Sequence, residues 1–287
     1  MTKNFYSPLR YPGGKNKLAK FVAEICVRNN VNGHYVEPYA GGASVALYLL
    51  LNGYVKRITI NDVDRAIYAF WYSVVNHTDE LCRRIEEAEI TLETREKCRK
   101  ILKRKKAAGL LDLGFSTFFL NRTNVSGILD GGVIGGLEQK GSYKIDCRFN
   151  KKALIKRIRA IAERAKDIDV RNLDALELIE DIQKRSRRKS NVIFYFDPPY
   201  YLKGSSLYLN HYEHDDHEKV SRAIQSIQNV RWIVSYDDTP EIRKMYRKSR
   251  SASLVLSHTA RERRQGKEVV FFSVGLKVPR VSRFVNA

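Results

Sequence analysis

The segment Asp197-Pro198-Pro199-Tyr200 has the most specific chemistry in this chain. It follows an apolar run at 191–196 that is typical of a buried strand. A carboxylate and a proline carbonyl can both accept hydrogen bonds from an exocyclic amino group, and the proline rings fix the local backbone. The ring of Tyr200 can stack on a flat heterocycle. These four residues would also suit an ordinary strand-to-loop turn, so the choice between the two interpretations depends on the rest of the chain.

A glycine-rich turn at residues 37–44 is the second candidate site. It reads Glu-Pro-Tyr-Ala-Gly-Gly-Ala-Ser, and glycines there let a ligand approach the backbone at a helix N-terminus. Glu37 would repel a pyrophosphate but suits a ligand with a cation or an amine. Asp62 ends the next expected strand, where an acidic residue commonly accepts hydrogen bonds from ribose hydroxyls. These features suit S-adenosylmethionine, and a turn without a ligand is the alternative.

The order of the elements predicts how these residues are positioned. Strands expected at 35–39 and 55–60 alternate with helices at 43–51 and 64–75, and the alternation returns after residue 167. Two late runs, 253–256 and 269–276, indicate a closing antiparallel pair. We therefore expect an α/β fold with a doubly wound sheet and a terminal antiparallel hairpin, formed by residues 1–76 and 167–287. Residues 77–166 break the alternation and are expected to form an inserted, mainly helical module.

The charge of the chain favours a polyanionic partner. Its 52 Lys and Arg residues exceed its 32 Asp and Glu residues, which gives a formal net charge of +20. Nucleic acid is the first candidate, and a protein that is basic for other reasons is the alternative. No apolar run is long enough for a membrane span and no secretory signal core is found, so a cytoplasmic location is expected. The four scattered cysteines suggest buried thiols in a reducing compartment.

Taken together, these segments resemble the Dam-like, D12 class N6-adenine-specific DNA methyltransferases. The order of the family's motifs is present from about residue 8 to residue 275, and the combination is much more specific than any single motif. The matching segments are Tyr11–Lys15, Glu37–Val45, Asn61-Asp62, Phe119–Arg122, Asn172–Asp174, Asp197–Tyr200, Ser235–Thr239 and Arg264–Glu268.

The resemblance implies a Rossmann-like methyltransferase sheet, with residues 77–166 as the target-recognition module for double-stranded DNA. The reaction would be methyl transfer from S-adenosylmethionine to N6 of a flipped adenine, with no metal. The residues implied for catalysis are Asp197, Pro198, Pro199 and Tyr200. Those implied for cofactor binding are Tyr11, Lys15, Glu37, Pro38, Asp62, Asp174 and Asp197, and those for DNA binding are Arg122 and Asn124.

Two departures from the family pattern concern the turn and the target. Ala43 stands where many relatives have glycine. The glycine-rich stretch 127–141 does not match the recognition hairpin of the members that methylate GATC, so the target sequence is not predicted. Two alternatives stay open: an RNA base methyltransferase, against which the inserted module argues, and a non-catalytic DNA-binding relative. A cytosine-C5 mechanism is disfavoured because none of the cysteines follows a proline.

Two further patterns have competing interpretations. The spacing of His211, His214 and His217 would suit a metal site. The preferred interpretation is that this segment is a loop and the start of a helix, and that it contacts DNA. Basic runs at 95–106, 151–166 and 184–189 are either solvated helix faces or phosphate contacts. Two of the three lie in the inserted module, which favours phosphate contacts for some of them.

Overall fold

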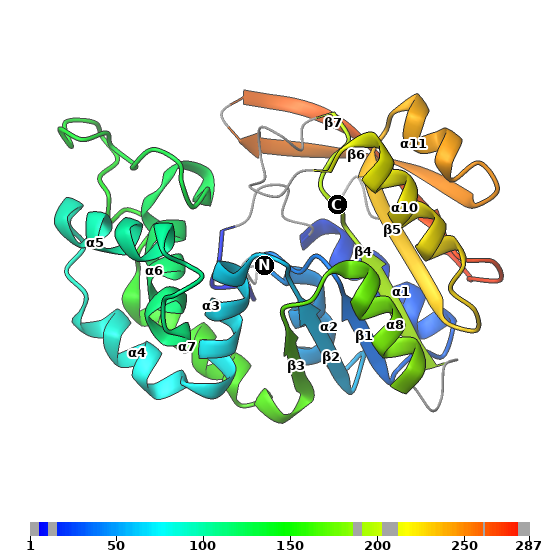
Figure 1. Cartoon of the computed structure of the whole chain (residues 1–287), viewed down its shortest axis with the longest axis horizontal. Coiled ribbons are helices and arrows are strands. Elements are labelled where there is room, and N and C mark those ends of the chain that lie inside the picture. Colours follow the sequence, from blue (N-terminus) through cyan, green and yellow to red (C-terminus); the bar gives the residue numbers. More distant parts are fainter. Residues whose placement is uncertain (1–5, 11–15, 186–190, 203–211, 261, 281–287) are drawn as a thin grey trace. The chain divides into compact units, whose positions relative to one another are not determined.

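The computed structural model describes residues 6–10, 16–185, 191–202, 212–260 and 262–280 (Figure 1). The chain divides into two compact units, which are described separately. Unit 1 comprises residues 1–14 and 64–172, and unit 2 comprises residues 15–63 and 173–287. Among the described residues, no helix is long and apolar enough to cross a membrane.

The described strands form a seven-stranded sheet in the order β3-β2-β1-β4-β5-β7-β6. Strand β1 is parallel to both β2 and β4, and β4 is parallel to β5. Strand β7 is antiparallel to both β5 and β6. The strands are β1 (His34–Glu37), β2 (Arg57–Asn61), β3 (Ile168–Arg171), β4 (Val192–Phe196), β5 (Arg231–Asp237), β6 (Arg250–Ala260) and β7 (Glu262–Phe272).

The expected doubly wound α/β sheet with an antiparallel end is confirmed, but the hairpin is longer than predicted. Strands β6 and β7 have 11 residues each, whereas the apolar runs predicted strands only at 253–256 and 269–276. The difference arises because residues 257–268 are mostly polar or charged and give no apolar signal. Strand β7 ends at Phe272, four residues before the predicted end.

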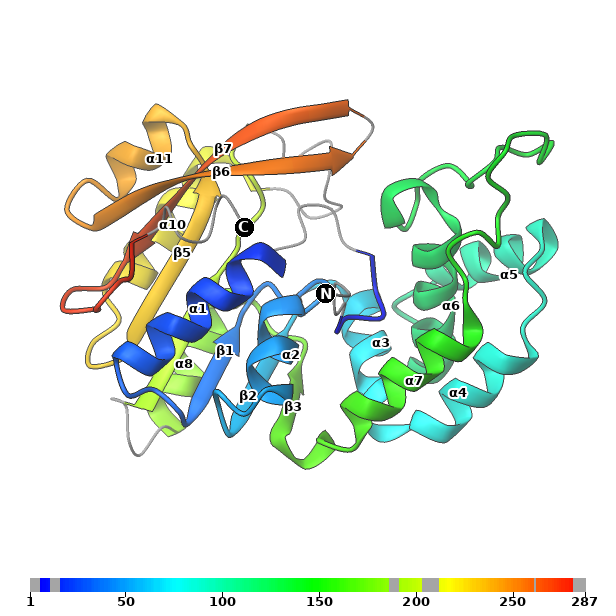
Figure 2. The same ribbon diagram turned by 180° about the vertical axis from the view of Figure 1, so that it is seen from behind.

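Helices cover both faces of the sheet in unit 2 (Figures 1 and 2). Helices α1 (Asn16–Arg28) and α2 (Ser44–Leu51) lie on one face, and α8 (Ala175–Arg185), α10 (His214–Gln225) and α11 (Pro240–Met245) lie on the other. Neighbouring side chains of a strand point to opposite faces. Accordingly Phe271 stacks on Tyr246 beside α11 with 4.6 Å between ring centroids, while Phe272 meets Phe21 of α1 at 6.2 Å.

Strand β4 is buried at all five positions, Val192 to Phe196. A central parallel strand that is covered on both faces needs apolar side chains on both, so it lacks the alternation of a half-exposed strand. Its even-numbered phenylalanines, Phe194 and Phe196, join the core beneath α8 and α10. Its odd-numbered side chains point to the other face of the sheet. Asp197 comes directly after the strand, at the next odd-numbered position.

Unit 1 is mainly helical. Its longer helices are α3 (Arg65–Asn76), α4 (Thr78–Glu87), α5 (Leu92–Lys103), α6 (Leu110–Thr123) and α7 (Lys151–Ala162). Helices α3 and α6 approach closely at Gly114, where an added Cβ would lie 2.4 Å from Ser73 Oγ. Unit 1 includes α3, so its boundaries differ from the module expected at 77–166. A role of this module in DNA recognition remains a prediction.

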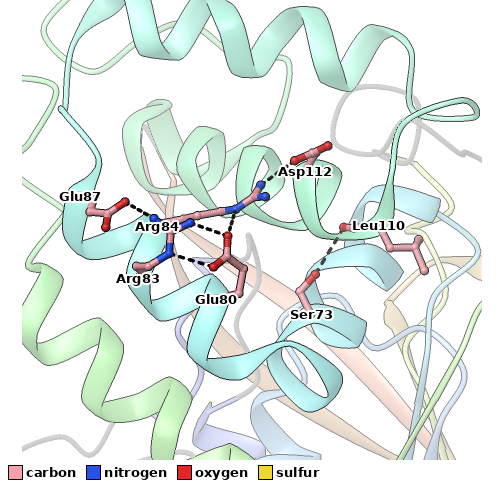
Figure 3. Close-up of polar contacts among 7 residues, drawn as sticks. All are labelled: Ser73, Glu80, Arg83, Arg84, Glu87, Leu110 and Asp112. Atoms are coloured by element: carbon pink, nitrogen blue, oxygen red, sulfur yellow. Dashed lines mark hydrogen bonds and ion pairs between the residues drawn. The ribbon is translucent and has the colours of Figure 1, made fainter.

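A group of ion pairs on α4 is joined to α6 by one pair, Arg84–Asp112, in unit 1 (Figure 3). Arg83 donates to Glu80 and Glu87 of its own helix, while Arg84 donates to Glu80 and to Asp112 of α6 at 2.6 Å. Because these groups are exposed to solvent, their contribution to stability is small. They matter here because they pair both arginines of α4 with carboxylates.

Candidate active site

The order of the strands reverses between β1 and β4. Strand β2 lies beyond β1 on one side, and β5 lies beyond β4 on the other. In open α/β sheets, ligands bind at the carboxyl ends of the strands at such a switch point. Glu37 is the last residue of β1, and Asp197 follows the last residue of β4. The two motifs that the sequence singles out therefore meet at the place where this fold binds ligands.

Glu37 is a buried carboxyl group at this switch point. Its Oε1 accepts hydrogen bonds from the Tyr35 hydroxyl at 2.8 Å and from the Ala46 backbone N–H at 3.2 Å. Its Oε2 is buried and has no hydrogen-bond partner among the residues that the structure describes. Burial raises the pKa of Glu37 to about 8, and the charge of Asp197 acts in the same direction. A cationic group beside Oε2 would satisfy this oxygen and favour the ionised carboxylate.

The turn after β1 is held by Asp62 and Asn61. The Gly41 N–H donates to Asp62 Oδ2 at 3.0 Å, and Gly41 and Ala43 both have positive φ values, 45° and 47°. Left-handed backbone at Ala43 is costly for a residue with a Cβ, which explains why glycine suits this position. The side-chain amide of buried Asn61 donates to the carbonyl oxygens of Pro38 and Leu173, at 2.9 and 3.0 Å.

Asn61 also fixes the segment that leads to Asp174. Its Oδ1 accepts a hydrogen bond from the Leu173 N–H at 2.9 Å. Asp174 then caps the start of α8, because its Oδ1 accepts a hydrogen bond from the Leu176 N–H at 2.8 Å. The structure thus brings Pro38, Asp62 and Asp174 together around Asn61, for which the sequence predicted only a place in a motif.

The Asp197–Tyr200 segment is anchored by side chains of β5 and β7. Asp197 Oδ1 accepts a hydrogen bond from the Ser235 hydroxyl at 2.8 Å. Pro198 is buried and Pro199 is half-buried. The buried Tyr200 donates its hydroxyl proton to Glu268 Oε1 at 2.5 Å, and Glu268 is itself 1% exposed. The hydroxyl of Tyr200 therefore makes a buried hydrogen bond, in addition to the stacking that the sequence analysis expects of its ring.

An aromatic cluster surrounds His217 beside this segment. The His217 ring lies 5.2 to 5.6 Å from the rings of Tyr201, Tyr212 and Tyr236, and its Nδ1 is 3.1 Å from the Tyr236 hydroxyl. Burial lowers the pKa of His217, which favours the neutral imidazole. Among the described residues, no group of three potential metal ligands is found, and His211 lies outside them. His214 pairs instead with the Tyr201 hydroxyl at 2.9 Å.

Unit 1 contains an arginine cluster, which we define as Arg10, Arg122, Arg148 and Arg157. The Arg122 guanidinium donates to the carbonyl oxygens of Arg148 and Pro8. Burial lowers the pKa of Arg122, and the charges of the other three arginines lower it further. Among the described residues, no carboxylate pairs with any member of the cluster. Such a concentration of unneutralised guanidinium groups favours an anion.

Asn124, which was expected to bind DNA together with Arg122, is fully buried. Its Oδ1 accepts a hydrogen bond from Arg95 Nε at 2.8 Å, and its amide nitrogen donates to the carbonyl oxygens of Ile128 and Leu129. Arg95, the first residue of the basic run 95–106, is also buried. These contacts make Asn124 a residue that holds the loop at 124–131 in its conformation.

Several predicted residues lie outside the part of the chain that the structure describes. They are Tyr11, Lys15, most of the basic run 184–189 and His211. The described residues that the sequence did not assign to the site are Asn61, Ser235, Asp237 and Glu268. All four lie in motifs that the sequence does contain, but a sequence motif does not say which strand end a side chain reaches.

Comparison with known proteins gives matches across most of the chain. A sequence model of the D12 class N6 adenine-specific DNA methyltransferases matches residues 11–262. The Type II methyltransferase M.MjaIII of Methanocaldococcus jannaschii is 23% identical over 270 residues, which cover 88% of this chain and 83% of that protein.

Solved structures are similar to the chain at low sequence identity. The SAM dependent methyltransferase from Agrobacterium tumefaciens has a TM-score of 0.41 and 10% identity, over 90% of this chain and 61% of that one. The rRNA methyltransferase aviRa from Streptomyces viridochromogenes has a TM-score of 0.41 and 12% identity, over 92% and 86%. The chain thus spans less than two thirds of the length of the first of these structures.

Proposed function

The chain belongs to the D12 class of N6 adenine-specific DNA methyltransferases, and from that premise we propose that it is a site-specific enzyme that methylates N6 of an adenine flipped out of duplex DNA. Its methyl donor is S-adenosylmethionine. The observation that carries the proposal is the meeting of Glu37 with the Asp197–Tyr200 segment at the switch point of the sheet. One motif suits a cationic cofactor and the other an amino group.

The described residues fit S-adenosylmethionine, which supplies a methyl group on a cationic sulfonium. Glu37 Oε2, which has no hydrogen-bond partner among the described residues, suits its positive charge, and Asp62 suits the ribose hydroxyls. Asp174, Pro38 and Asp197 would complete the site, as would Tyr11 and Lys15, which the structure does not describe. Glycine-turn backbone at positive φ leaves room for close approach of the cofactor.

The Asp197–Tyr200 segment would hold the adenine. The Asp197 carboxylate and the Pro198 carbonyl oxygen would accept hydrogen bonds from the N6 amino group. As the nitrogen becomes tetrahedral, its lone pair can then point at the methyl group, and the carboxylate stabilises the developing positive charge. Tyr200 would stack on the flipped base. Catalysis by these residues is mainly positioning and electrostatic stabilisation.

Asp62→Ala should weaken binding of S-adenosylmethionine by about 10-fold or more, because a hydrogen bond to a charged group contributes roughly 1.5–3 kcal/mol. Asp62→Asn is the matched variant, since its side-chain oxygen can still accept the hydrogen bond from the Gly41 N–H. Isothermal titration calorimetry measures both affinities. If Asp62→Ala bound the cofactor as tightly as the wild type, the ribose assignment would be wrong.

Tyr200→Ala should lose about 1–3 kcal/mol of base binding, because it removes the stacking ring. Tyr200→Phe keeps the ring but leaves buried Glu268 without the hydroxyl donor, so we expect a smaller, measurable loss. A mismatch at the target adenine should partly rescue the alanine variant alone, since an unpaired base is easier to extrude. Single-turnover methylation of matched and mismatched duplexes tests this, and equal losses in both variants would assign the main role to the hydroxyl.

The reaction itself is tested with the purified chain, labelled S-adenosylmethionine and nucleic acids of defined sequence. Mass spectrometry of digested duplex DNA should show N6-methyladenine, and sequencing of the methylated product should show one sequence context. A single-stranded RNA and a duplex RNA of the same sequence form the comparison. Methylation of RNA in preference to DNA would overturn the assignment of the substrate, and the Asp197→Ala variant controls for contaminating enzymes.

A further inference from the structure

The carboxyl end of β5 holds the Asp197–Tyr200 segment at both ends. Ser235 and Asp237 are two residues apart, so their side chains point to the same face of the sheet. Ser235 Oγ donates to Asp197 Oδ1 at 2.8 Å. Asp237 accepts hydrogen bonds from the backbone N–H groups of Tyr201 and Leu202, at 2.8 and 3.0 Å. One strand therefore fixes both the catalytic carboxylate and the backbone that follows Tyr200.

A second hydroxyl lies behind Ser235. The Tyr195 hydroxyl of β4 is 2.9 Å from Ser235 Oγ, and both residues are buried, at 3% and 0% exposed. A serine hydroxyl has a single proton to donate. Because Ser235 gives that proton to the carboxylate, Tyr195 has to be the donor in the second hydrogen bond. The result is a directed chain from Tyr195 through Ser235 to Asp197, in which each hydrogen bond polarises the next.

We propose that Ser235, supported by Tyr195, is a positioning residue for methyl transfer that fixes the rotation of the Asp197 carboxylate and favours its ionised form. This rests on the proposed function of Asp197. A carboxylate that accepts a hydrogen bond from a substrate amino group must be held within a few tenths of an ångström to act in the transition state. Neither Ser235 nor Tyr195 needs to touch the substrate for this role.

Such support would oppose the electrostatic effect of the groups around Asp197. Two described titratable groups lie close enough to interact electrostatically with Asp197, Glu37 on β1 and Tyr236 on β5. An ionised Glu37 would repel the charge of Asp197 and favour its protonated form. The Ser235 hydroxyl donates a hydrogen bond to the carboxylate, which stabilises the ionised form of Asp197 and so acts in the opposite direction. Removal of the Ser235 hydroxyl should therefore raise the pH at which Asp197 takes up a proton.

The kinetic test compares three variants under single-turnover conditions. Ser235→Ala should lower the methylation rate by about 10-fold or more, with affinities for DNA and cofactor changed by about twofold or less. Tyr195→Phe, which removes only the distant hydroxyl, should have a smaller effect in the same direction. Ser273→Ala is the matched control, because it removes another buried serine hydroxyl, directly after β7, whose Oγ accepts a hydrogen bond from the Trp232 N–H at 3.1 Å.

The dependence on pH separates positioning from a general loss of structure. In Ser235→Ala the acid limb of the rate profile should move to higher pH, in Tyr195→Phe it should move less, and in Ser273→Ala it should stay in place. Loss of rate without any movement of the limb in Ser235→Ala and Tyr195→Phe would overturn the proposal. If Ser235→Ala failed to fold, Tyr195→Phe would still give the answer.

An independent measurement needs no activity at all. Carbon-13 NMR of the side-chain carboxyl groups, assigned with Asp197→Asn, follows the titration of Asp197 in the protein without DNA or cofactor. We expect a higher midpoint in Ser235→Ala and the wild-type midpoint in Ser273→Ala. If the wild type methylated no DNA but the midpoint still moved, the proposed function would fail and the hydrogen-bond chain would stand. An unchanged midpoint in an active enzyme would overturn the hydrogen-bond chain alone.

Discussion

Asp197→Ala should lower the single-turnover rate of DNA methylation by about 100-fold or more. Loss of one preplaced group that stabilises charge in the transition state typically has this effect. The structure supports an effect of this size because Asp197 lies at the switch point of the sheet, and a hydrogen bond from Ser235 fixes its carboxylate. The rate is measured with enzyme in excess over a short duplex, so that product release does not mask the chemical step.

Two further variants show whether the loss comes from the carboxylate itself. Asp197→Asn keeps the shape of the side chain but removes its charge, so it should be nearly as inactive as the alanine variant. Asp215→Asn, at an exposed position in the first turn of α10, removes the same charge elsewhere in unit 2 and should keep full activity. Retention of more than about a tenth of the wild-type rate in Asp197→Ala would contradict the assigned role.

Much of this site could be predicted because its motifs follow strands that have clear patterns. The apolar run before Asp197 predicts a buried strand, and parallel strands place their carboxyl ends at one edge of the sheet. Together with the resemblance to the family, this predicted a cofactor site that includes Glu37, Asp62 and Asp197. The long hairpin of β6 and β7 was not predictable to its full length, because residues 257–268 have the polarity of a loop.

The contacts that tune the site could not be predicted, because they depend on register between distant segments. Ser235 reaches Asp197 only because β4 pairs with β5 in one particular register. Glu268 reaches the Tyr200 hydroxyl because it lies opposite Asp237 on β7. A shift of one residue in either pairing would turn these side chains to the other face of the sheet. The sequence contains the residues but no local signal for the pairing.

Asn124 is a second example of packing that the sequence could not predict. The resemblance to the family implied that it contacts DNA together with Arg122. The structure gives its amide three partners inside unit 1, Arg95, Ile128 and Leu129. A polar residue in a family motif can thus be fully engaged in internal hydrogen bonds, and only the local packing shows this.

The affinity of the chain for duplex DNA should fall by about 1,000-fold between 50 and 200 mM salt. A protein that neutralises at least six phosphates releases enough counterions for a loss of this size, which corresponds to a slope of log K against log salt of roughly −5 or steeper. The reasons for this expectation are the net charge of +20 and the arginine cluster of unit 1. Fluorescence anisotropy with a labelled duplex measures the slope.

A pair of matched variants separates the arginine cluster from the total charge. Arg148→Gln removes an exposed member of the cluster and should make the slope less steep by about one. Arg83→Gln, on α4 in the same unit, removes an equal charge from a guanidinium that is already paired with Glu80 and Glu87, so the slope should not change.

Equal effects of the two variants would mean that total charge governs DNA binding, and a flat salt response of the wild type would remove the support for phosphate contacts. A change in Arg148→Gln alone would place DNA phosphate at the arginine cluster, because a counterion is released only where a phosphate is neutralised.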